Sequence, residues 1–477
     1  MRFRVERDAL ADALAWVARA LPSRPVVPVL TGLRLAAGEG LTLSCFDYEV
    51  SATAHIDAEV KDAGTVLVPG RLLAEITRSL PAQPADFEAD GDEVNLTCGS
   101  AEFTFIQLPG DEYPALPEPP PLAGTIDGGD LAAAIGQVLP AVSRDDTLPM
   151  LTGICLDIEG ETMTLAATDR YRLAVRETGW QPASPGLRAV ALVPARTLAD
   201  AARAMTPGLA VSIGFETGTG AGGGQEPRPA EGMISFGMGG RRLTARLIGG
   251  EFIRYRSRFP SEFGCRADVP AGPFTEAVRR VSLVADRASP VRLAFGPGSV
   301  VVEAQTEGRA RAVETVTAEF HGDQPVISFN PHYLLDGLVA AAAPAHPRHA
   351  ADHADAADSA GGSGSGGSGS GGSESGGSGS GGSGSGGMAD VGTGGAGLGE
   401  ASAEEVGAGG SADPGLLRLE FTSPAKPALI TRAQFGGAQG GGAQGSGEHD
   451  GESDRAASAG VPQFRYLVVP LRAAVRS

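Results

Sequence analysis

The sequence predicts an α+β protein made of three copies of one unit, each with two helices and several antiparallel strands. Three observations predict this architecture. Apolar residues recur at helical spacing in segments that begin near residues 7, 128 and 271. The tripeptide Leu-Thr-Gly follows the first and the second of these segments. In every copy a strand-like run and a turn that contains proline then precede a second helical segment.

The first helix of each copy is expected over residues 7–24, 128–144 and 271–287. In the first two copies, its apolar stripe consists of Leu10, Leu14, Val17, Leu21, Leu131, Ile135, Val138 and Val142. An arginine stands at the end of each of these segments: Arg24, Arg144 and Arg287. The next strands are expected in "VVPVLTGLRLAA", "TLPMLTGICLDI" and "SPVRLAFG".

The second helix of each copy is expected within residues 65–80, 188–205 and 325–341. Each is preceded by a strand and by a proline at the helix start, where proline is tolerated best: Pro69, Pro194 and Pro331. Alternating strands follow, in "EVNLTCGSAEFTFIQL", "MISFGMGGRRLTARLI" and "LLRLEFTSPAKPALITRA". The glycines of "GMGGRR" precede a strand and therefore indicate a hairpin turn, not a phosphate-binding loop.

Two low-complexity insertions interrupt the third copy. Residues 345–413 and 436–460 contain almost no apolar side chains, so we expect them to be disordered, as we do the shorter stretch 216–232. The histidines near the start of the long insertion, His346, His349 and His353, reflect composition and not a metal site. The predicted domains are 1–123, 124–264 and 265–477.

Composition limits the classes of function. The chain has 38 Lys+Arg against 57 Asp+Glu, a net charge of −19, which argues against a protein coated in basic surface. The four cysteines are widely spaced and support neither a zinc site nor a disulfide framework. The charged N-terminal residues are unlike a signal peptide, and no apolar run approaches membrane-spanning length. These features predict a cytoplasmic protein.

Arginines recur on or beside the helices of all three copies. A single such arginine is as often a solvated surface residue, but recurrence at matching places favours a basic face for sequence-independent phosphate contact. No motif for base readout is present. Arg19 belongs to the group in the first copy; the predicted DNA-contacting residues are Arg24, Arg71, Arg78, Arg144, Arg196, Arg203, Arg279, Arg280 and Arg287.

Four motifs in this order give the chain a specific resemblance. "SRPVVPVLTGL", "VPGRLLAEITRSLP", "ATDRYRLAV" and the terminal "YLVVPLR" resemble the bacterial DNA polymerase III beta subunit family, the replication sliding clamps. The resemblance covers all three copies and implies a head-to-tail homodimeric ring around duplex DNA. It implies a non-catalytic, nucleoid-associated processivity factor without cofactor or metal. The implied partners are the polymerase III alpha subunit, the clamp loader and other proteins with a clamp-binding motif.

The same resemblance implies a hydrophobic pocket for partner peptides. Its residues in this chain would be Leu151, Thr168, Arg170, Tyr171, Arg172, Leu173, Ile253, Arg258, Leu467, Val469, Pro470 and Leu471. Phe103 and Phe105 are the implied residues of the dimer interface.

Departures from the family pattern leave an alternative open. Ile253 stands at a usual proline, Arg258 at a usual small apolar residue, and Arg170 at a frequent glycine. These changes, with the insertions, are compatible with a divergent clamp paralogue or peptide-binding scaffold that has altered partners and no main replicative role. An enzyme using Thr168, Asp169, Tyr171 and Arg172 is disfavoured, because no paired carboxylate, nucleophile–base pair or metal set accompanies them. The equivalent "LSCFDYEVSA" (43–52) of the first copy also indicates an ordinary turn.

Overall fold

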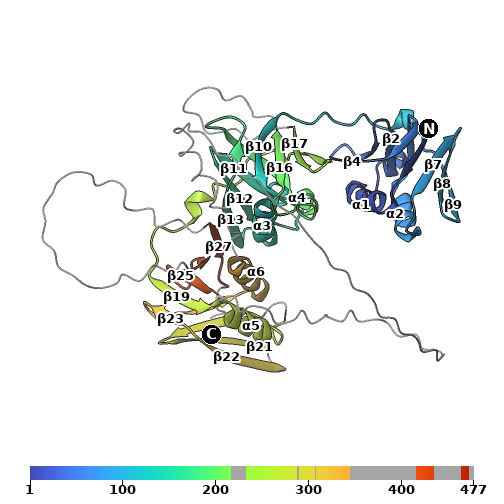
Figure 1. Ribbon diagram of the computed structural model, residues 1–477. Helices are drawn as coiled ribbons and strands as arrows, with labels where there is room; N and C mark the ends of the chain where they lie inside the picture. The colour runs from blue at the N-terminus through green and yellow to red at the C-terminus, as the bar shows by residue number, and fades with distance from the viewer. Residues whose placement is uncertain (216–231, 287–288, 307, 344–414, 434–462, 472–477) are drawn as a thin grey trace, which may run out of the picture. The chain divides into compact units, whose positions relative to one another are not determined.

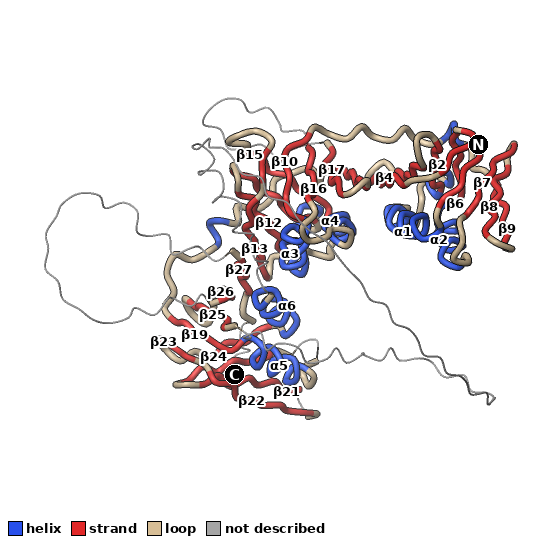
Figure 2. Tube along the Cα trace, viewed as in Figure 1, coloured by secondary structure: helices blue, strands red, loops and turns tan. Residues whose placement is uncertain are grey.

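The computed structural model describes residues 1–215, 232–286, 289–306, 308–343, 415–433 and 463–471 (Figures 1 and 2). The two insertions predicted at 345–413 and 436–460 lie outside these residues, as do residues 216–231 of the shorter stretch. The same holds for Arg287 and for His346, His349 and His353.

The described elements repeat one topology three times: a strand, a helix, five strands, a helix and three strands. The first copy contains β1 (Arg2–Val5), α1 (Arg7–Val17), β2 (Gly32–Ala37), β3 (Leu41–Phe46), β4 (Val50–Ile56), β5 (Glu59–Asp62), β6 (Gly64–Pro69), α2 (Gly70–Ser79), β7 (Ala85–Asp90), β8 (Glu93–Cys98) and β9 (Ala101–Ile106). The second contains β10 (Leu122–Asp127), α3 (Gly128–Val138), β11 (Gly153–Glu159), β12 (Thr162–Thr168), β13 (Arg172–Gly179), β14 (Gln181–Pro182), β15 (Arg188–Pro194), α4 (Ala195–Ala202), β16 (Ala210–Phe215), β17 (Met233–Met238) and β18 (Arg241–Arg246). The third contains β19 (Cys265–Pro270), α5 (Ala271–Ser282), β20 (Val291–Gly296), β21 (Ser299–Thr306), β22 (Ala310–Thr317), β23 (Glu319–His321), β24 (Val326–Phe329), α6 (Pro331–Ala342), β25 (Leu416–Phe421), β26 (Ala428–Arg432) and β27 (Phe464–Val468).

The α+β class and the two helices per copy are therefore confirmed, whereas the boundaries at 123 and 264 stay predictions. The first helices end earlier than predicted. In the second copy, α3 ends at Val138 because Pro140 cannot continue the hydrogen-bond ladder, and a 3-10 turn (Leu139–Ala141) follows. The two Leu-Thr-Gly motifs also begin in 3-10 turns (Pro28–Thr31 and Pro149–Leu151), so the strands after them start only at the motif glycines, Gly32 and Gly153.

All strand pairs among the described residues are antiparallel, and two large sheets cross from one copy to the next. Strand β18 of the second copy pairs with β4 of the first, and β27 of the third copy pairs with β13 of the second. The sheet orders are β5-β1-β7-β8-β9, β14-β10-β16-β17-β18-β4-β3-β2-β6, β15-β11-β12-β13-β27-β26-β25-β19-β23 and β22-β21-β20-β24. Consequently β9 and β22 lie at sheet edges within the described part of the chain.

The helices pack in pairs against these sheets, α1 with α2, α3 with α4 and α5 with α6 (Figure 2). The pairing buries apolar residues of all three copies in one connected cluster, and this burial supplies most of the folding free energy. Side-chain caps fix two helix starts: Asp127 accepts from the amides of Gly129 and Asp130, and Asn330 accepts from those of His332 and Tyr333.

The four cysteines are free thiols, buried except for the half-buried Cys265. Burial raises the pKa of the Cys45 thiol to about 12, so it stays protonated at neutral pH. No helix among the described residues has the length and apolar character needed to cross a bilayer.

Candidate functional site

The turn between β12 and β13 is held by the side chain of Asp169. Its Oδ1 accepts hydrogen bonds from the amides of Tyr171 and Arg172, both at 3.0 Å. Thr168 Oγ1 donates to the Arg172 carbonyl at 2.6 Å. Arg170 takes the left-handed conformation, with φ of 79°. Asp169 is thus used as a local backbone acceptor, as short polar side chains in turns commonly are.

The equivalent turn of the first copy has the same construction. Asp47 Oδ1 accepts from the amides of Glu49 and Val50, and Tyr48 has φ of 74°. The residue after the aspartate is left-handed in both copies, which confirms the predicted correspondence of the two turns. The turn shape alone therefore does not indicate a binding site.

Arg170→Gly should stabilise the protein by about 0.5–1 kcal/mol. The left-handed backbone costs a non-glycine residue about 1–2 kcal/mol, and glycine removes this cost. Glycine also loses more conformational entropy on folding, which cancels part of the stabilisation. Urea unfolding followed by circular dichroism measures the change. Arg170→Ala removes the same side chain but keeps the backbone cost, so an equal gain in that variant would contradict the explanation.

Arg172 connects the turn to the third copy. Its Nε donates to Asp169 Oδ2 at 2.9 Å, and its Nη1 donates to Asp336 Oδ2 on α6 at 2.5 Å. The same Nη1 lies 3.4 Å from Tyr466 Oη on β27, and the guanidinium stacks 4.4 Å from the centroid of the Tyr333 ring. Only 10% of the Arg172 side chain is exposed. Arg172 is therefore first of all a structural link between two copies.

A hydrophobic groove of about 550 Å³ lies where β13 and β27 pair. Leu173 is opposite Leu467 in the strand register, and both belong to a buried cluster with Val175, Leu192 and Tyr255. The groove is lined by Leu151, Thr168, Arg170, Arg172, Leu173, Ile253, Ser257, Arg258, Pro427, Leu467 and Val469. Apolar side chains thus form its floor and arginines stand among its walls.

The segment between β18 and β19 reaches the groove because two of its side chains are bonded to β11. The buried Tyr255 hydroxyl donates to Asp157 Oδ2 at 2.6 Å, and Arg256 Nη2 donates to the same oxygen at 3.0 Å. Burial, with the bond to Asp157, raises the pKa of Tyr255 and keeps the phenol a donor. These bonds position Ile253 and Arg258 on the groove wall.

The structure brings nine of the twelve predicted pocket residues together in this groove. Tyr171, Pro470 and Leu471 are not among its lining residues. Pro470 is buried, and the Leu471 amide donates to the Ser328 carbonyl on β24, so these two residues hold the segment that follows β27. Ser257 and Pro427 were missed; the strand signal that follows Pro427 could have placed it beside β27.

Tyr171 lies instead in a neighbouring polar cavity of about 790 Å³. Its ring stacks on Tyr333, with centroids 6.1 Å apart. The charges in this cavity are close to balanced: Arg144, Arg170 and Arg172 stand with Asp145, Asp169 and Asp336. Arg170 and Arg172 line both cavities, so the two are adjacent.

The predicted DNA-contacting arginines that the structure describes fall into three groups. Arg203, Arg279 and Arg280 form ion pairs with Asp200, Glu276 and Glu314, which reduces the charge they offer to a phosphate. Arg71 donates to the Leu21 carbonyl and partly serves the fold. Within the described residues, Arg24, Arg78, Arg144 and Arg196 are exposed and have no carboxylate within 4.0 Å.

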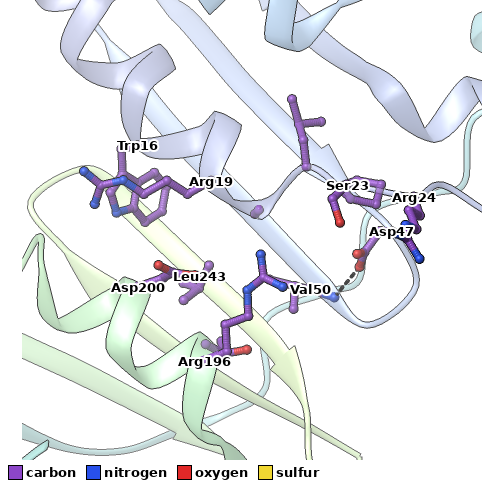
Figure 3. Close-up of a pocket in the computed structure, with 13 residues that line it drawn as sticks. Trp16, Arg19, Ser23, Arg24, Asp47, Val50, Arg196, Asp200 and Leu243 are labelled. Atoms are coloured by element: carbon purple, nitrogen blue, oxygen red, sulfur yellow. Dashed lines mark hydrogen bonds between the residues drawn. The ribbon is translucent and has the colours of Figure 1, made fainter. Parts of the chain in front are cut away.

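Arg24 and Arg196 come from different copies but line one cleft of about 280 Å³. Figure 3 shows Trp16 and Arg19 of the first copy facing Arg196 and Asp200 of α4. Asp47 and Asp200 also line the cleft, so its charge is mixed. The cleft demonstrates that helix-associated arginines of neighbouring copies come to lie together.

Phe103 and Phe105 lie on the inner face of β9. Phe105 is 3% exposed and packs in the core of its own copy, and Phe103 is half-buried against the same core. Phe105 therefore has almost no side-chain surface for a partner subunit. The exposed apolar residue of this edge strand is Ile106. In the described part of the chain, no group of three His, Cys, Asp or Glu side chains could hold a metal ion.

Comparison with known proteins agrees with this architecture. Three family models match: the N-terminal domain of the DNA polymerase III beta subunit at residues 1–117, its central domain at 125–253 and its C-terminal domain at 256–345. The "Beta sliding clamp" of Streptomyces coelicolor is 52% identical over 72% of this chain and 89% of its own length. The "Beta sliding clamp homolog GriR" of Streptomyces muensis is 43% identical over 71% of this chain and 88% of its own.

Solved structures share the fold. The sliding clamp of Bacillus subtilis matches with a TM-score of 0.72 and 20% identity over 99% of this chain and 100% of its own. A Pseudomonas aeruginosa clamp described as bound to griselimycin matches with a TM-score of 0.70 and 22% identity, over 99% and 100%. With three matched domains and a relative more than half identical, the chain belongs to the DNA polymerase III beta subunit family, the beta sliding clamps.

Proposed function

We propose that two copies of this sliding clamp assemble head to tail into a ring around duplex DNA. A clamp loader opens the ring and closes it around the DNA. The closed ring then tethers the polymerase III alpha subunit and binds clamp-binding peptides in the groove. Family membership supports the clamp role, and the 52% identity to a named beta sliding clamp supports the replicative form over a divergent paralogue. The ring, the partners, the site residues and the cytoplasmic location are parts of the proposal.

The proposed ring is supported by a regular pattern of strand pairing between copies. The last strand of a copy pairs with the third strand after the first helix of the preceding copy: β18 with β4, and β27 with β13. The equivalent strands left over are β9 and β22, each at the edge of its sheet. Pairing β9 of one subunit with β22 of another continues the same rule, and doing so twice closes two chains into a ring.

The chemistry of the two edges favours such pairing. Edge strands present unpaired backbone groups that attract a further strand. Ile106 on β9 and Val313 on β22 are exposed apolar residues, which a partner strand would cover. The backbone of β9 and Ile106, more than Phe105, are then the interface of the first copy.

Ring closure also explains how an acidic chain can hold DNA. A closed ring retains DNA by topology, so only weak, salt-sensitive phosphate contacts are needed. Arg24, Arg78, Arg144 and Arg196 can supply these contacts. An overall charge of −19 is compatible with sliding, because tight phosphate binding would slow it.

Val313→Asp should abolish stable retention on circular DNA. The charge would be placed at the proposed β22 edge contact, where a carboxylate would lose its hydration. The protein is loaded by a clamp loader onto nicked circular plasmid, and the bound fraction is followed by gel filtration before and after a restriction enzyme linearises the circle. We expect wild-type protein to stay on circles, to leave after cutting and to be a dimer in sedimentation, and Val313→Asp to be a monomer.

Val326→Asp is the matched control. Val326 is 49% exposed, as is Val313, but it lies on β24 at the opposite edge of the same sheet. Its substitution should leave both the dimer and retention intact. Equal retention of wild-type protein on circular and linear DNA would rule out the ring. Intact peptide binding without any loader-dependent retention would favour the scaffold alternative.

A further inference from the structure

The hydrophobic groove defined above carries an uncompensated positive charge. Three of its lining residues are arginines, Arg170, Arg172 and Arg258, and none of its described lining residues is acidic. The chain as a whole has the opposite balance, with 57 acidic against 38 basic residues. An excess of one sign at a docking surface selects the partner by charge.

The three arginines are not equivalent. Arg172 is neutralised by Asp169 and Asp336 and is almost buried. Arg170 and Arg258 are exposed, and neither has a carboxylate within 4.0 Å among the described residues. Asp145 is in the adjacent cavity; its pKa is lowered mainly by hydrogen bonds from the hydroxyl and amide of Thr147 and only lastly by the charge of Arg170. Two arginines therefore remain available to a bound molecule.

The backbone holds both of these arginines in place before anything binds. Arg170 is fixed in the left-handed conformation by the Asp169 turn. Arg258 ends the 3-10 turn Arg256–Arg258, its amide donates to the Tyr255 carbonyl, and Tyr255 is bonded to Asp157. Because the backbone is already fixed, binding costs entropy only in the two arginine side chains. The charges are thus a built feature of the groove walls, beside the apolar floor of Leu173 and Leu467.

We propose that this groove selects acidic peptides: extended segments whose apolar anchors lie on the Leu173–Leu467 floor and whose flanking Asp or Glu residues pair with Arg170 and Arg258. The inference rests on the proposed peptide-docking function and adds its charge specificity. Guanidinium groups bind carboxylates with two parallel hydrogen bonds where the geometry allows. Because the arginines are exposed, each pair should contribute only about threefold in affinity, and the two together about tenfold.

The test uses the full-length protein and two synthetic peptides. Both carry the same leucine and phenylalanine anchors; in one the flanking positions are Asp and Glu, and in the other they are Asn and Gln. Titration calorimetry measures both dissociation constants at low salt and at 0.5 M NaCl. We expect the acidic peptide to bind about tenfold more tightly at low salt, and the ratio to shrink towards one at high salt because exposed pairs are screened.

Arginine variants assign the preference to its residues. Arg170→Gln and Arg258→Gln should each lower the ratio of the two affinities to about threefold, and the double variant should bring it to about one. Arg242→Gln removes the same charge from an exposed position on β18 that does not line the groove, and should keep the tenfold ratio. Equal binding of the two peptides, or an unchanged ratio in the double variant, would overturn the charge specificity alone. If neither peptide binds, both the peptide-docking function and the charge specificity are ruled out.

Discussion

Arg172→Ala should lower the free energy of unfolding by about 3 kcal/mol. Breaking a buried ion pair is costly because the partner charge stays behind without compensation. Asp169, with 12% of its side chain exposed, would lose its bond to Nε, and Tyr466, fully buried, would lose a polar neighbour. Asp336 is more exposed and would be rehydrated, so we place the effect at the lower end of the range for buried pairs.

The loss should be felt mainly where two copies meet. Arg172 belongs to β13 of the second copy, whereas Asp336, Tyr333 and Tyr466 belong to the third. Thermal unfolding followed by circular dichroism should show a fall in Tm of several degrees. Arg172→Lys keeps the charge but cannot reach Asp169 and Asp336 together, so it should recover less than half of the loss.

Arg188→Ala is the matched control for this prediction. Arg188 pairs with Glu159 on the same sheet, but 63% of its side chain is exposed. Exposed pairs contribute at most about 1 kcal/mol, and often nothing measurable. Comparable losses in the two variants would show that burial of Arg172 is not the source of its stabilising effect.

Local signals in the sequence were enough to predict all six helices and many of the strands. Apolar spacing located the helices, and Pro69, Pro194 and Pro331 marked the starts of the second helices. The pairing of β18 with β4 and of β27 with β13 could not be read from local pattern, because the partners are far apart in the chain. The short strands before the first helices were missed for a related reason: "RFRV" and "LAGTID" are too short to show a period.

In the groove, too, local sequence signals could not show which distant residues lie together. Leu173 and Leu467 could be placed together only through the family resemblance, and the structure confirms that they are opposite each other. Tyr171 was expected to line the groove, but its ring stacks on Tyr333 instead. The left-handed conformation of Arg170 changes the direction of the chain just before Tyr171. Composition could not show that Arg203, Arg279 and Arg280 are paired with acids, because two of these pairs depend on helix register and one on a strand from elsewhere in the copy.

Gly337→Ala should destabilise the protein by about 2 kcal/mol, although alanine is the better helix former. Gly337 lies in α6, where it faces the fully buried Tyr466. A Cβ at this position would stand 2.5 Å from two ring carbons of Tyr466, well inside contact distance. The ring cannot withdraw easily, because its hydroxyl donates to the Tyr333 carbonyl at 2.9 Å. Overpacking of this kind costs about 1–3 kcal/mol, and more where the obstacle is rigid.

The opposing effect is the helix propensity of alanine, which exceeds that of glycine by about 1 kcal/mol. Gly136 isolates this effect, because it is an exposed glycine of α3 whose Cβ would meet nothing within 4 Å. Gly136→Ala should therefore raise the free energy of unfolding by about 1 kcal/mol in the same urea experiment. The same glycine-to-alanine substitution then changes the free energy of unfolding in opposite directions in two helices of one chain. The direction depends on whether a buried ring faces the glycine. A Gly337→Ala protein as stable as wild type would mean that α6 can move away from β27, and that the packing of these two elements within the third copy is looser than the burial of Tyr466 implies.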